Sequence, residues 1–176
     1  DPSDYLGHGT HVAGIAAAKG NNSLGVAGVC YNCKIMPVRA GFVIRYPGSS
    51  AFGTFEYDDM VSAIKYAADN GADVINMSLG GAYSETVKEA IDYAYSKGAI
   101  IIAAAGNEET EEKKYSYHAA LDNVIAVAAT VKDDTRASYS NYGDWVDVSA
   151  PGGDGDNGII STVPTTALEG HSSGYA

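Results

Sequence analysis

Apolar residues recur at helical spacing in the chain. Between residues 58 and 70, one helix face collects the apolar side chains Met60, Val61, Ile64, Ala67 and Ala68. Asp58 and Asp59 suit the first turn of this helix and Gly71 its carboxyl end, because carboxylates favour helix starts and glycine tolerates a left-handed cap. A second helix is expected from the capping residue Ser84 to Lys97, and an alanine-rich one from His8 to Ala18.

Short apolar runs lie between and beyond these helices. Ala99–Ala105 is continuously apolar and bounded by glycines, which is typical of a strand buried on both faces, and Val124–Ala129 is similar. Further strands are expected at Asp73–Ser78, Lys34–Arg39, Trp145–Val148 and Ile159–Val163. Helices of about a dozen residues between apolar strands predict βαβ units. The pattern therefore indicates an α/β fold with a mostly parallel central sheet flanked by helices.

Polar segments interrupt this pattern. Gly41–Tyr57, with Pro47 and several glycines and serines, and the charged run Glu108–Lys114 are both predicted to be surface loops. Ligand sites of parallel sheets lie at the carboxyl ends of the strands. The polar segment Ser78–Gly81 and the segment from Gly106 onward are expected at such ends.

Composition narrows the class of protein. The chain has 176 residues, 45% of them hydrophobic, which corresponds to about one domain with a real core and excludes a disordered tail. Its net charge of −11 argues against nucleic acid or an anionic membrane as a partner. No apolar run reaches the roughly 18 residues of a membrane-spanning helix.

Two short motifs contain residues whose side chains can act in catalysis or bind a metal. His8 and His11 are three residues apart, but a zinc site needs further ligands, and His118 and His171 are isolated. The glycines beside His8 allow close approach of a partner or substrate to its backbone. Asn107, directly after an apolar strand and a glycine, either forms an ordinary turn or directs its amide into a cleft.

Taken together, the motifs resemble the subtilisin-like serine proteases, the subtilase family. Five ordered segments covering nearly the whole chain carry the resemblance: His-Gly-Thr-His-Val-Ala-Gly at 8–14, Lys-Ile-Met-Pro-Val-Arg at 34–39, Asp-Val-Ile-Asn-Met-Ser-Leu-Gly-Gly at 73–81, Ala-Ala-Ala-Gly-Asn at 103–107, and Tyr-Ser-Asn-Tyr-Gly at 139–143 with the Val-Asp-Val-Ser-Ala-Pro-Gly that follows it at 146–152. A Rossmann-type nucleotide site is disfavoured, because no Gly-x-Gly-x-x-Gly follows a strand with an acidic residue downstream.

The resemblance implies roles for particular residues. His8 would be the general base of an Asp-His-Ser triad, and Asn107 the side-chain donor of the oxyanion hole. Ser78, Leu79 and Gly80 match the segment that pairs with an extended polypeptide substrate. The remaining matches are to pocket residues: Ala104 and Gly106 to the walls of the primary pocket for a large apolar side chain, and Tyr57, Met60 and Leu79 to a more distant apolar pocket, with Met60 equally explained as core.

Parts of the family pattern are missing from the chain. No Asp-x-Gly strand precedes His8, Asp4 matches a non-catalytic acid, and Ser172 and Ser173 do not match the Gly-Thr-Ser-x-Ala motif of the serine. We therefore expect residues 1–176 to be an interior fragment of a catalytic domain, inactive by itself. The alternative is a pseudoprotease module that binds peptides without cleaving them.

The resemblance also bears on metal, cysteines and location. No cofactor is required for the chemistry, but residues 20–26 match a calcium-binding loop in which Asn22 would supply a side-chain oxygen. Cys30 and Cys33 fit a local disulfide of a secreted protein better than a redox pair, with two buried thiols as the alternative. A secreted parent, with a propeptide or protein inhibitor as further partners, is the resulting expectation.

Overall fold

The computed structural model describes residues 3–48, 50–155 and 157–165. Contacts among residues divide the chain into two compact units. The first comprises Asp1–Asp59 and Ile160–Ala176, and the second comprises Met60–Ile159. No helix among the described residues is long and apolar enough to cross a membrane.

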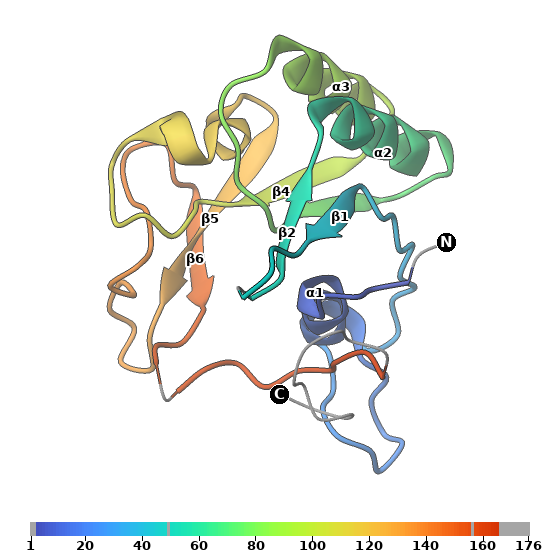
Figure 1. Ribbon diagram of the computed structural model, residues 1–176, viewed down its shortest axis with the longest axis vertical. Helices are drawn as coiled ribbons and strands as arrows, with labels where there is room; N and C mark the ends of the chain where they lie inside the picture. The colour runs from blue at the N-terminus through green and yellow to red at the C-terminus, as the bar shows by residue number, and fades with distance from the viewer. Residues whose placement is uncertain (1–2, 49, 156, 166–176) are drawn as a thin grey trace. The chain divides into compact units, whose positions relative to one another are not determined.

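A four-stranded parallel sheet forms the centre of the second unit (Figure 1). Its strands follow the order β3 (Val74–Met77), β4 (Ile100–Ala104), β5 (Val124–Thr130) and β6 (Val148–Pro151). Every neighbouring pair is parallel. Helix α3 (Glu85–Ser96) connects β3 to β4, and helix α2 (Tyr57–Asp69) leads into β3. This arrangement confirms the α/β fold with a parallel sheet flanked by helices.

The two helices form where their apolar period predicts them. Helix α2 buries Met60, Ile64, Ala67 and Ala68, and α3 buries Val87, Ala90, Ile91 and Ala94. The hydroxyl of Ser84 accepts a hydrogen bond from the Val87 amide and caps α3. Gly71 and Gly98 follow the two helices with φ of 77° and 93°, the left-handed conformation that glycine adopts without a steric penalty.

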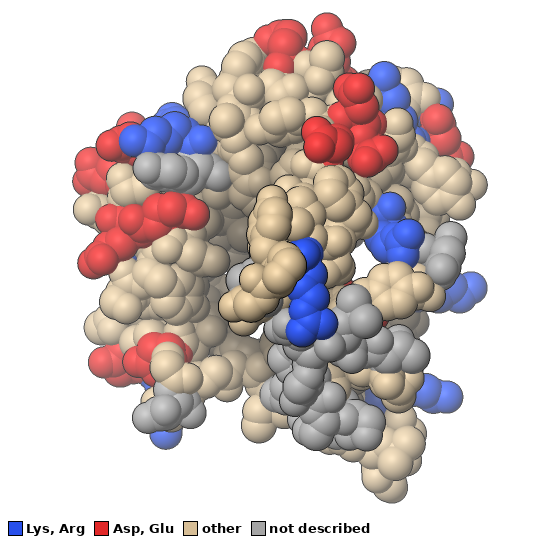
Figure 2. Space-filling model, in the orientation of Figure 1, with Lys and Arg blue, Asp and Glu red and all other residues tan. Residues whose placement is uncertain are grey.

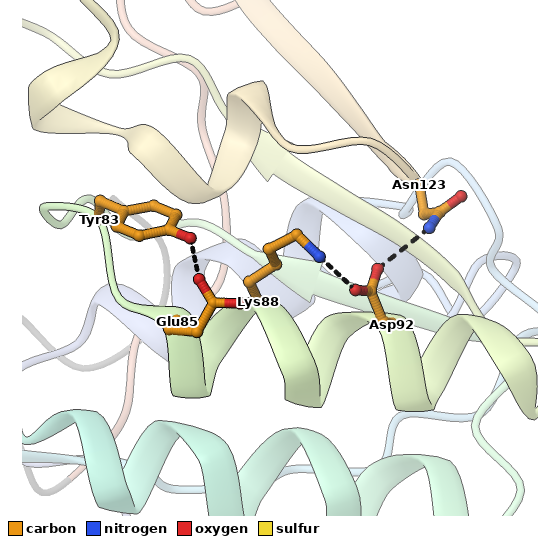
Figure 3. Close-up of polar contacts among 5 residues, drawn as sticks. All are labelled: Tyr83, Glu85, Lys88, Asp92 and Asn123. Carbon is orange, nitrogen blue, oxygen red and sulfur yellow. Dashed lines mark hydrogen bonds and ion pairs between the residues drawn. The ribbon is translucent and has the colours of Figure 1, made fainter.

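The exposed side of α3 is held by polar contacts (Figure 3). Lys88 pairs with Asp92 at 2.6 Å, one helical turn along, and Asn123 donates to the same carboxylate at 3.1 Å. Tyr83 donates to Glu85 at the start of the helix. Hydrogen bonds from Lys88 and Asn123 lower the pKa of Asp92, so the carboxylate that joins α3 to the start of β5 stays charged.

The two faces of the sheet differ in burial. Ile75, Met77, Ile101, Ala103 and Ala126 are buried on one face, together with the apolar sides of the helices. On the other face, the apolar residues remain accessible: Val74 is 51% exposed, Ile100 50%, Ile125 38% and Val148 50%. The predicted burial of β4 on both faces is therefore wrong at Ile100, because nothing among the described residues covers that end of the second face.

The first unit is built on helix α1 (His8–Ala17) and an antiparallel hairpin of β1 (Gly41–Ile44) and β2 (Phe52–Phe55). The hairpin corrects the prediction of a loop over 41–57. Pro47 and Gly48, which indicated a loop, lie in its turn, whereas Gly41 and Gly53 lie in the two short strands themselves. Gly28 lies so close to the backbone of Ala17 and Ala18 that a Cβ would come within 2.4–2.6 Å of it, so only glycine fits there.

Three other predicted strands differ from the structure. Residues 34–39 are exposed and form no backbone ladder with any described residue, so they are not a strand. At 145–148 the strand begins three residues late, because the backbone first turns, with the Val146 amide donating to the Gly143 carbonyl at 3.3 Å. Residues 159–163 form no strand either. The Ser161 and Thr162 hydroxyls donate to the His11 and Thr10 carbonyls of α1 at 2.6 and 2.9 Å.

Two short 3₁₀ helices, η1 (Lys113–Tyr115) and η2 (Tyr117–Ala120), precede β5. Most of the charged run at 108–114 is exposed, as predicted for a solvated segment. Acidic side chains are prominent on the face that Figure 2 shows, in agreement with the net charge of −11.

Candidate active site

His8 is the first residue of α1, and its side chain is exposed. The preceding residue, Gly7, adopts φ of 100°, which turns the chain sharply into the helix. The imidazole therefore lies at a helix start, on a backbone whose direction is set by a glycine.

Asp4 fixes this helix start, a role that the sequence did not reveal. Its Oδ1 accepts hydrogen bonds from the Leu6 and Gly7 amides at 3.0 and 2.8 Å. Its Oδ2 accepts from both the amide and the hydroxyl of Thr10, each at 2.8 Å. Partial burial by itself would raise the pKa of Asp4, but these four hydrogen bonds outweigh it and lower the pKa. Asp4 is therefore a charged cap that positions the backbone around His8.

In the second unit, the segment Ser78–Gly81 follows the carboxyl end of β3. Met77 pairs with Ala103, so Ser78 and Ala104 follow side by side at the carboxyl ends of β3 and β4. The Ser78 hydroxyl accepts from Asn76 at 2.9 Å, and the Gly81 carbonyl accepts from the Tyr117 amide at 3.0 Å. Gly80 is exposed, and no described residue bonds its backbone N–H or C=O. This segment is an open backbone edge.

The loop after β4 carries Asn107 at the same end of the strands. The Asn107 side chain is exposed, and its amide has no partner among the described residues. Gly106 has φ of 102°, and a Cβ there would come within 2.5 Å of both Asn141 Nδ2 and Ser116 Oγ. A residue larger than glycine therefore cannot occupy position 106 without moving the loop.

Asn141 is fully buried and binds the loop of residues 105–110. Its Nδ2 donates to the Ala105 carbonyl at 2.9 Å and to Glu108 Oε2 at 2.6 Å. Its Oδ1 accepts from the amides of Glu108 and Thr110 at 3.0 and 3.1 Å. All the hydrogen-bonding capacity of this amide is thus used on residues 105–110.

Glu108 completes the arrangement around Asn107. Its Oε2 also accepts the backbone N–H of Asn107 at 3.0 Å, so the same carboxylate binds Asn141 and Asn107. The backbone that carries Asn107 is therefore fixed while its side chain stays free, which is the arrangement that a preorganised donor requires. Sequence reasoning treated Glu108 as part of a solvated charge run and did not single out Asn141.

The residues predicted to line pockets differ in exposure. Ala104, Gly106 and Leu79 are half-buried. Met60 is 2% exposed on the buried side of α2, in agreement with a core position. Tyr57 is partly exposed and its ring contacts the edge of Phe55, with 6.1 Å between centroids.

Cys30 and Cys33 are joined by a disulfide in an exposed turn after α1. Asn22 lies in an exposed loop, where its Oδ1 accepts from the Leu24 amide at 3.1 Å. No cluster of three or more His, Cys, Asp or Glu side chains suited to a metal occurs in the part of the chain that the structure describes. The calcium loop expected at residues 20–26, with Asn22 as a ligand, stays a prediction. His171, Ser172 and Ser173 lie outside the described residues.

Comparison with known proteins places these features in context. The model of the subtilase family, Peptidase_S8, matches residues 1–175. A thermophilic serine proteinase of Bacillus sp. (strain AK1) is 49% identical over 166 residues, which span 93% of this chain and 37% of that protein. Thermitase of Thermoactinomyces vulgaris is 43% identical over 94% of this chain and 54% of its own length.

Solved structures agree with the sequence comparison. A structure described as proteases from Pseudoalteromonas arctica superposes with a TM-score of 0.80 at 38% identity, covering 96% of this chain and 52% of that one. A psychrophilic protease, S41, superposes with a TM-score of 0.73 at 34% identity, covering 99% of this chain and 58% of that one. The chain thus spans between about a third and six-tenths of the length of these relatives.

Proposed function

This chain belongs to the subtilase family, and on that premise we propose that it forms part of a serine endopeptidase that hydrolyses extended polypeptides. His8 is the general base: it takes the proton of a serine hydroxyl during attack and returns it to the leaving amine. The side-chain amide of Asn107 donates to the oxyanion that develops on the scissile carbonyl. The serine and aspartate of the triad have no matching motif in residues 1–176, so the isolated chain is expected to be inactive.

The observation that carries the proposal is the contrast within the Asn107 loop. Asn141 and Glu108 bind the backbone of residues 105–110 from one side, while the Asn107 amide has no described partner and faces solvent. A structural asparagine would use its amide within the fold, as Asn141 does. An amide held in place but left unbonded is suited to a charge that appears only during a reaction.

The substrate pairs with the open edge of Ser78–Gly80 by adding a strand. The backbone N–H and C=O of Gly80 are available for this pairing. By resemblance to the family, Ala104 and Gly106 line the primary pocket for a large apolar side chain and Leu79 contributes to a second apolar pocket, whereas Met60 is 2% exposed and belongs to the core. A propeptide or protein inhibitor would bind along the same edge.

Location and metal complete the proposal. The parent is secreted, which the Cys30–Cys33 disulfide supports, since disulfides persist outside the cytosol. One relative, from Xanthomonas campestris, bears the name extracellular protease. A structural calcium at residues 20–26 would use Asn22, and we expect EDTA to lower the Tm of the full-length protein.

The test is hydrolysis by the full-length protein of a tetrapeptide anilide with phenylalanine before the scissile bond. His8→Ala is expected to abolish turnover. Asn107→Ala is expected to lower kcat by about 10²–10³-fold, a magnitude carried over from the same donor in a subtilisin rather than worked out from this structure. Asn32→Ala, at an exposed asparagine of the disulfide turn, is the matched control and should leave kcat unchanged.

Two results would contradict the proposal. An Asn107→Ala variant with unchanged kcat would remove Asn107 from the oxyanion hole. A full-length protein that binds the peptide but does not cleave it, and that no fluorophosphonate probe labels, would be the peptide-binding pseudoprotease instead. Labelling of the isolated 176-residue chain by such a probe would show that its expected inactivity is wrong.

A further inference from the structure

His118 is a buried histidine to which the proposed function gives no role. It lies in η2 and is 4% exposed. Its Nε2 is 2.8 Å from the carbonyl oxygen of Leu79, which is 39 residues earlier in the chain. Because a carbonyl oxygen can only accept, Nε2 carries the hydrogen and donates. The histidine thus binds the middle residue of the segment to which the peptide substrate is assigned.

Other contacts join the same two segments. The Tyr117 amide donates to the Gly81 carbonyl at 3.0 Å, and Gly81 and Ser116 form a parallel bridge. The ring of Tyr117 packs edge-on against Tyr83, with 4.7 Å between centroids. Residues 116–118 therefore contact residues 79, 81 and 83.

The direction of the carbonyls explains why this matters for a peptide. Successive carbonyls of an extended segment point to opposite sides. The Leu79 and Gly81 carbonyls both point to residues 116–118, where they are bonded. Gly80 lies between them, is exposed, and has no backbone partner among the described residues. The Leu79 and Gly81 carbonyls are thus bonded to residues 116–118, and the backbone N–H and C=O of Gly80 face the opposite side, where a peptide can reach them.

We propose that His118 is a positioning residue that holds the Leu79 carbonyl and so presents Ser78–Gly80 as a fixed edge to an extended peptide. The proposal rests on the peptide-binding part of the proposed function and not on catalysis. Without the Nε2–H donor, the Leu79 carbonyl is no longer held, and the backbone of Ser78–Gly80 loses its fixed orientation. Peptides long enough to pair with the edge are then affected, and shorter ones are not.

The state of the ring is consistent with this role. Burial lowers the pKa of His118, and the hydrogen bond to Leu79 only partly opposes that shift. The imidazole is therefore neutral at neutral pH, with its one hydrogen on the nitrogen that faces Leu79. The interaction is a neutral hydrogen bond that does not depend on a nearby acid.

Three variants of the full-length protein separate the hydrogen bond from simple packing. His118→Gln places an amide N–H near the position of Nε2 and retains the donor. His118→Met fills a similar volume without a donor, and His118→Asn retains an amide that ends short of Leu79. The probes are labelled Ala-Ala-Ala-Phe amide and Ala-Phe amide, with Kd measured by fluorescence anisotropy and kcat/KM measured on the matching anilides.

The measured quantity is the ratio of the Kd of Ala-Phe amide to that of Ala-Ala-Ala-Phe amide, which states how much more tightly the long peptide binds. In His118→Met this ratio of affinities should fall roughly tenfold, the effect of leaving one buried carbonyl unsatisfied. His118→Gln should retain the ratio to within about threefold, since its donor replaces the lost one. If His118→Met does not fold, the comparison of His118→Gln with His118→Asn takes its place, with the loss expected in His118→Asn.

The outcomes distinguish this inference from the proposed function. An unchanged ratio in His118→Met, or an equal loss in His118→Gln and His118→Met, overturns the positioning role while hydrolysis by the wild type continues. A wild type that binds the long peptide without cleaving it leaves the positioning role supported and the catalytic proposal refuted. A wild type that hydrolyses the anilides with no preference for the long peptide overturns the positioning role and leaves the catalytic proposal supported.

Discussion

The fully bonded amide of Asn141 makes a single-atom change informative. Asn141→Asp retains the shape of the side chain and the two hydrogen bonds accepted from Glu108 and Thr110. It removes the two donated bonds, to the Ala105 carbonyl and to Glu108 Oε2. It also places a second carboxylate 2.6 Å from that of Glu108, where an N–H was before.

The magnitude follows from these lost contacts. A buried carbonyl left without its donor costs about 1–3 kcal/mol. The bond to the exposed Glu108 carboxylate adds about 1 kcal/mol after allowance for solvent screening, with repulsion between the carboxylates in the same direction. We therefore expect Asn141→Asp to lower the free energy of unfolding by about 3 kcal/mol at pH 7. The kcat for a peptide anilide should fall as well, because the Asn107 loop loses its support.

The assay is urea denaturation of the full-length protein, followed by fluorescence at pH 7 and pH 5. Two facing carboxylates share a proton more readily in the folded state than in the unfolded state. The stability of Asn141→Asp should therefore recover toward that of the wild type as the pH falls. Glu108→Gln combined with Asn141→Asp should regain about half of the loss, since the glutamine amide can donate to Asp at position 141. A midpoint equal to that of the wild type, or no recovery in the double variant, would refute this account of the loop.

Three further predictions concern single features of the fold. Asp4→Ala should lower the free energy of unfolding by about 1–2 kcal/mol at pH 7. The pKa of Asp4 is lowered in the folded state, so this contribution is fully present above the ordinary value of 3.8 and is lost as the pH falls through the lower folded value. The urea midpoints of wild type and variant should therefore converge as the pH is lowered below 3.8. Replacing Cys30 and Cys33 by serine should cost about 2 kcal/mol, the entropy of closing so short a loop, and a larger loss in calorimetry would contradict that estimate. Gly106→Ala should lower kcat of the full-length protein at least tenfold, because a Cβ there displaces the Asn107 loop, and unchanged kcat would show that the loop adapts.

The elements with a clear apolar period could be predicted closely from the sequence. The helices expected at 58–70 and 84–97 form at Tyr57–Asp69 and Glu85–Ser96, because one face of each is buried and that face sets the period. The hairpin at 41–55 was not predicted. Its strands are four residues long, too short for a period to outweigh the loop signal of Pro47 and Gly48 in the turn and of Gly41 and Gly53 in the strands themselves.

The supporting residues of the candidate site lay beyond sequence reasoning for a different reason. Asn141 and His118 bind loops that are 31 to 39 residues away in the chain. Nothing in the local sequence around either residue specifies those partners. His8 and Asn107 could be singled out because neighbouring glycines and a preceding strand mark them locally, whereas a residue that acts through distant backbone is visible only after folding.

The accessible apolar face of the sheet has a consequence for the handling of this chain. Val74, Ile100, Ile125 and Val148 form a diagonal band on one face of the four strands, since Val74 pairs with Ile100, whereas Ile125 pairs with Ile102 and Val148 with Val127. Each of the four is exposed by a third or more. Such a band binds other chains that carry the same band, at a rate that rises with concentration. When residues 1–176 are produced in a bacterial host, we therefore expect most of the material in inclusion bodies at 37 °C. Slower synthesis, or fusion to a partner that masks the band, should shift it to the supernatant.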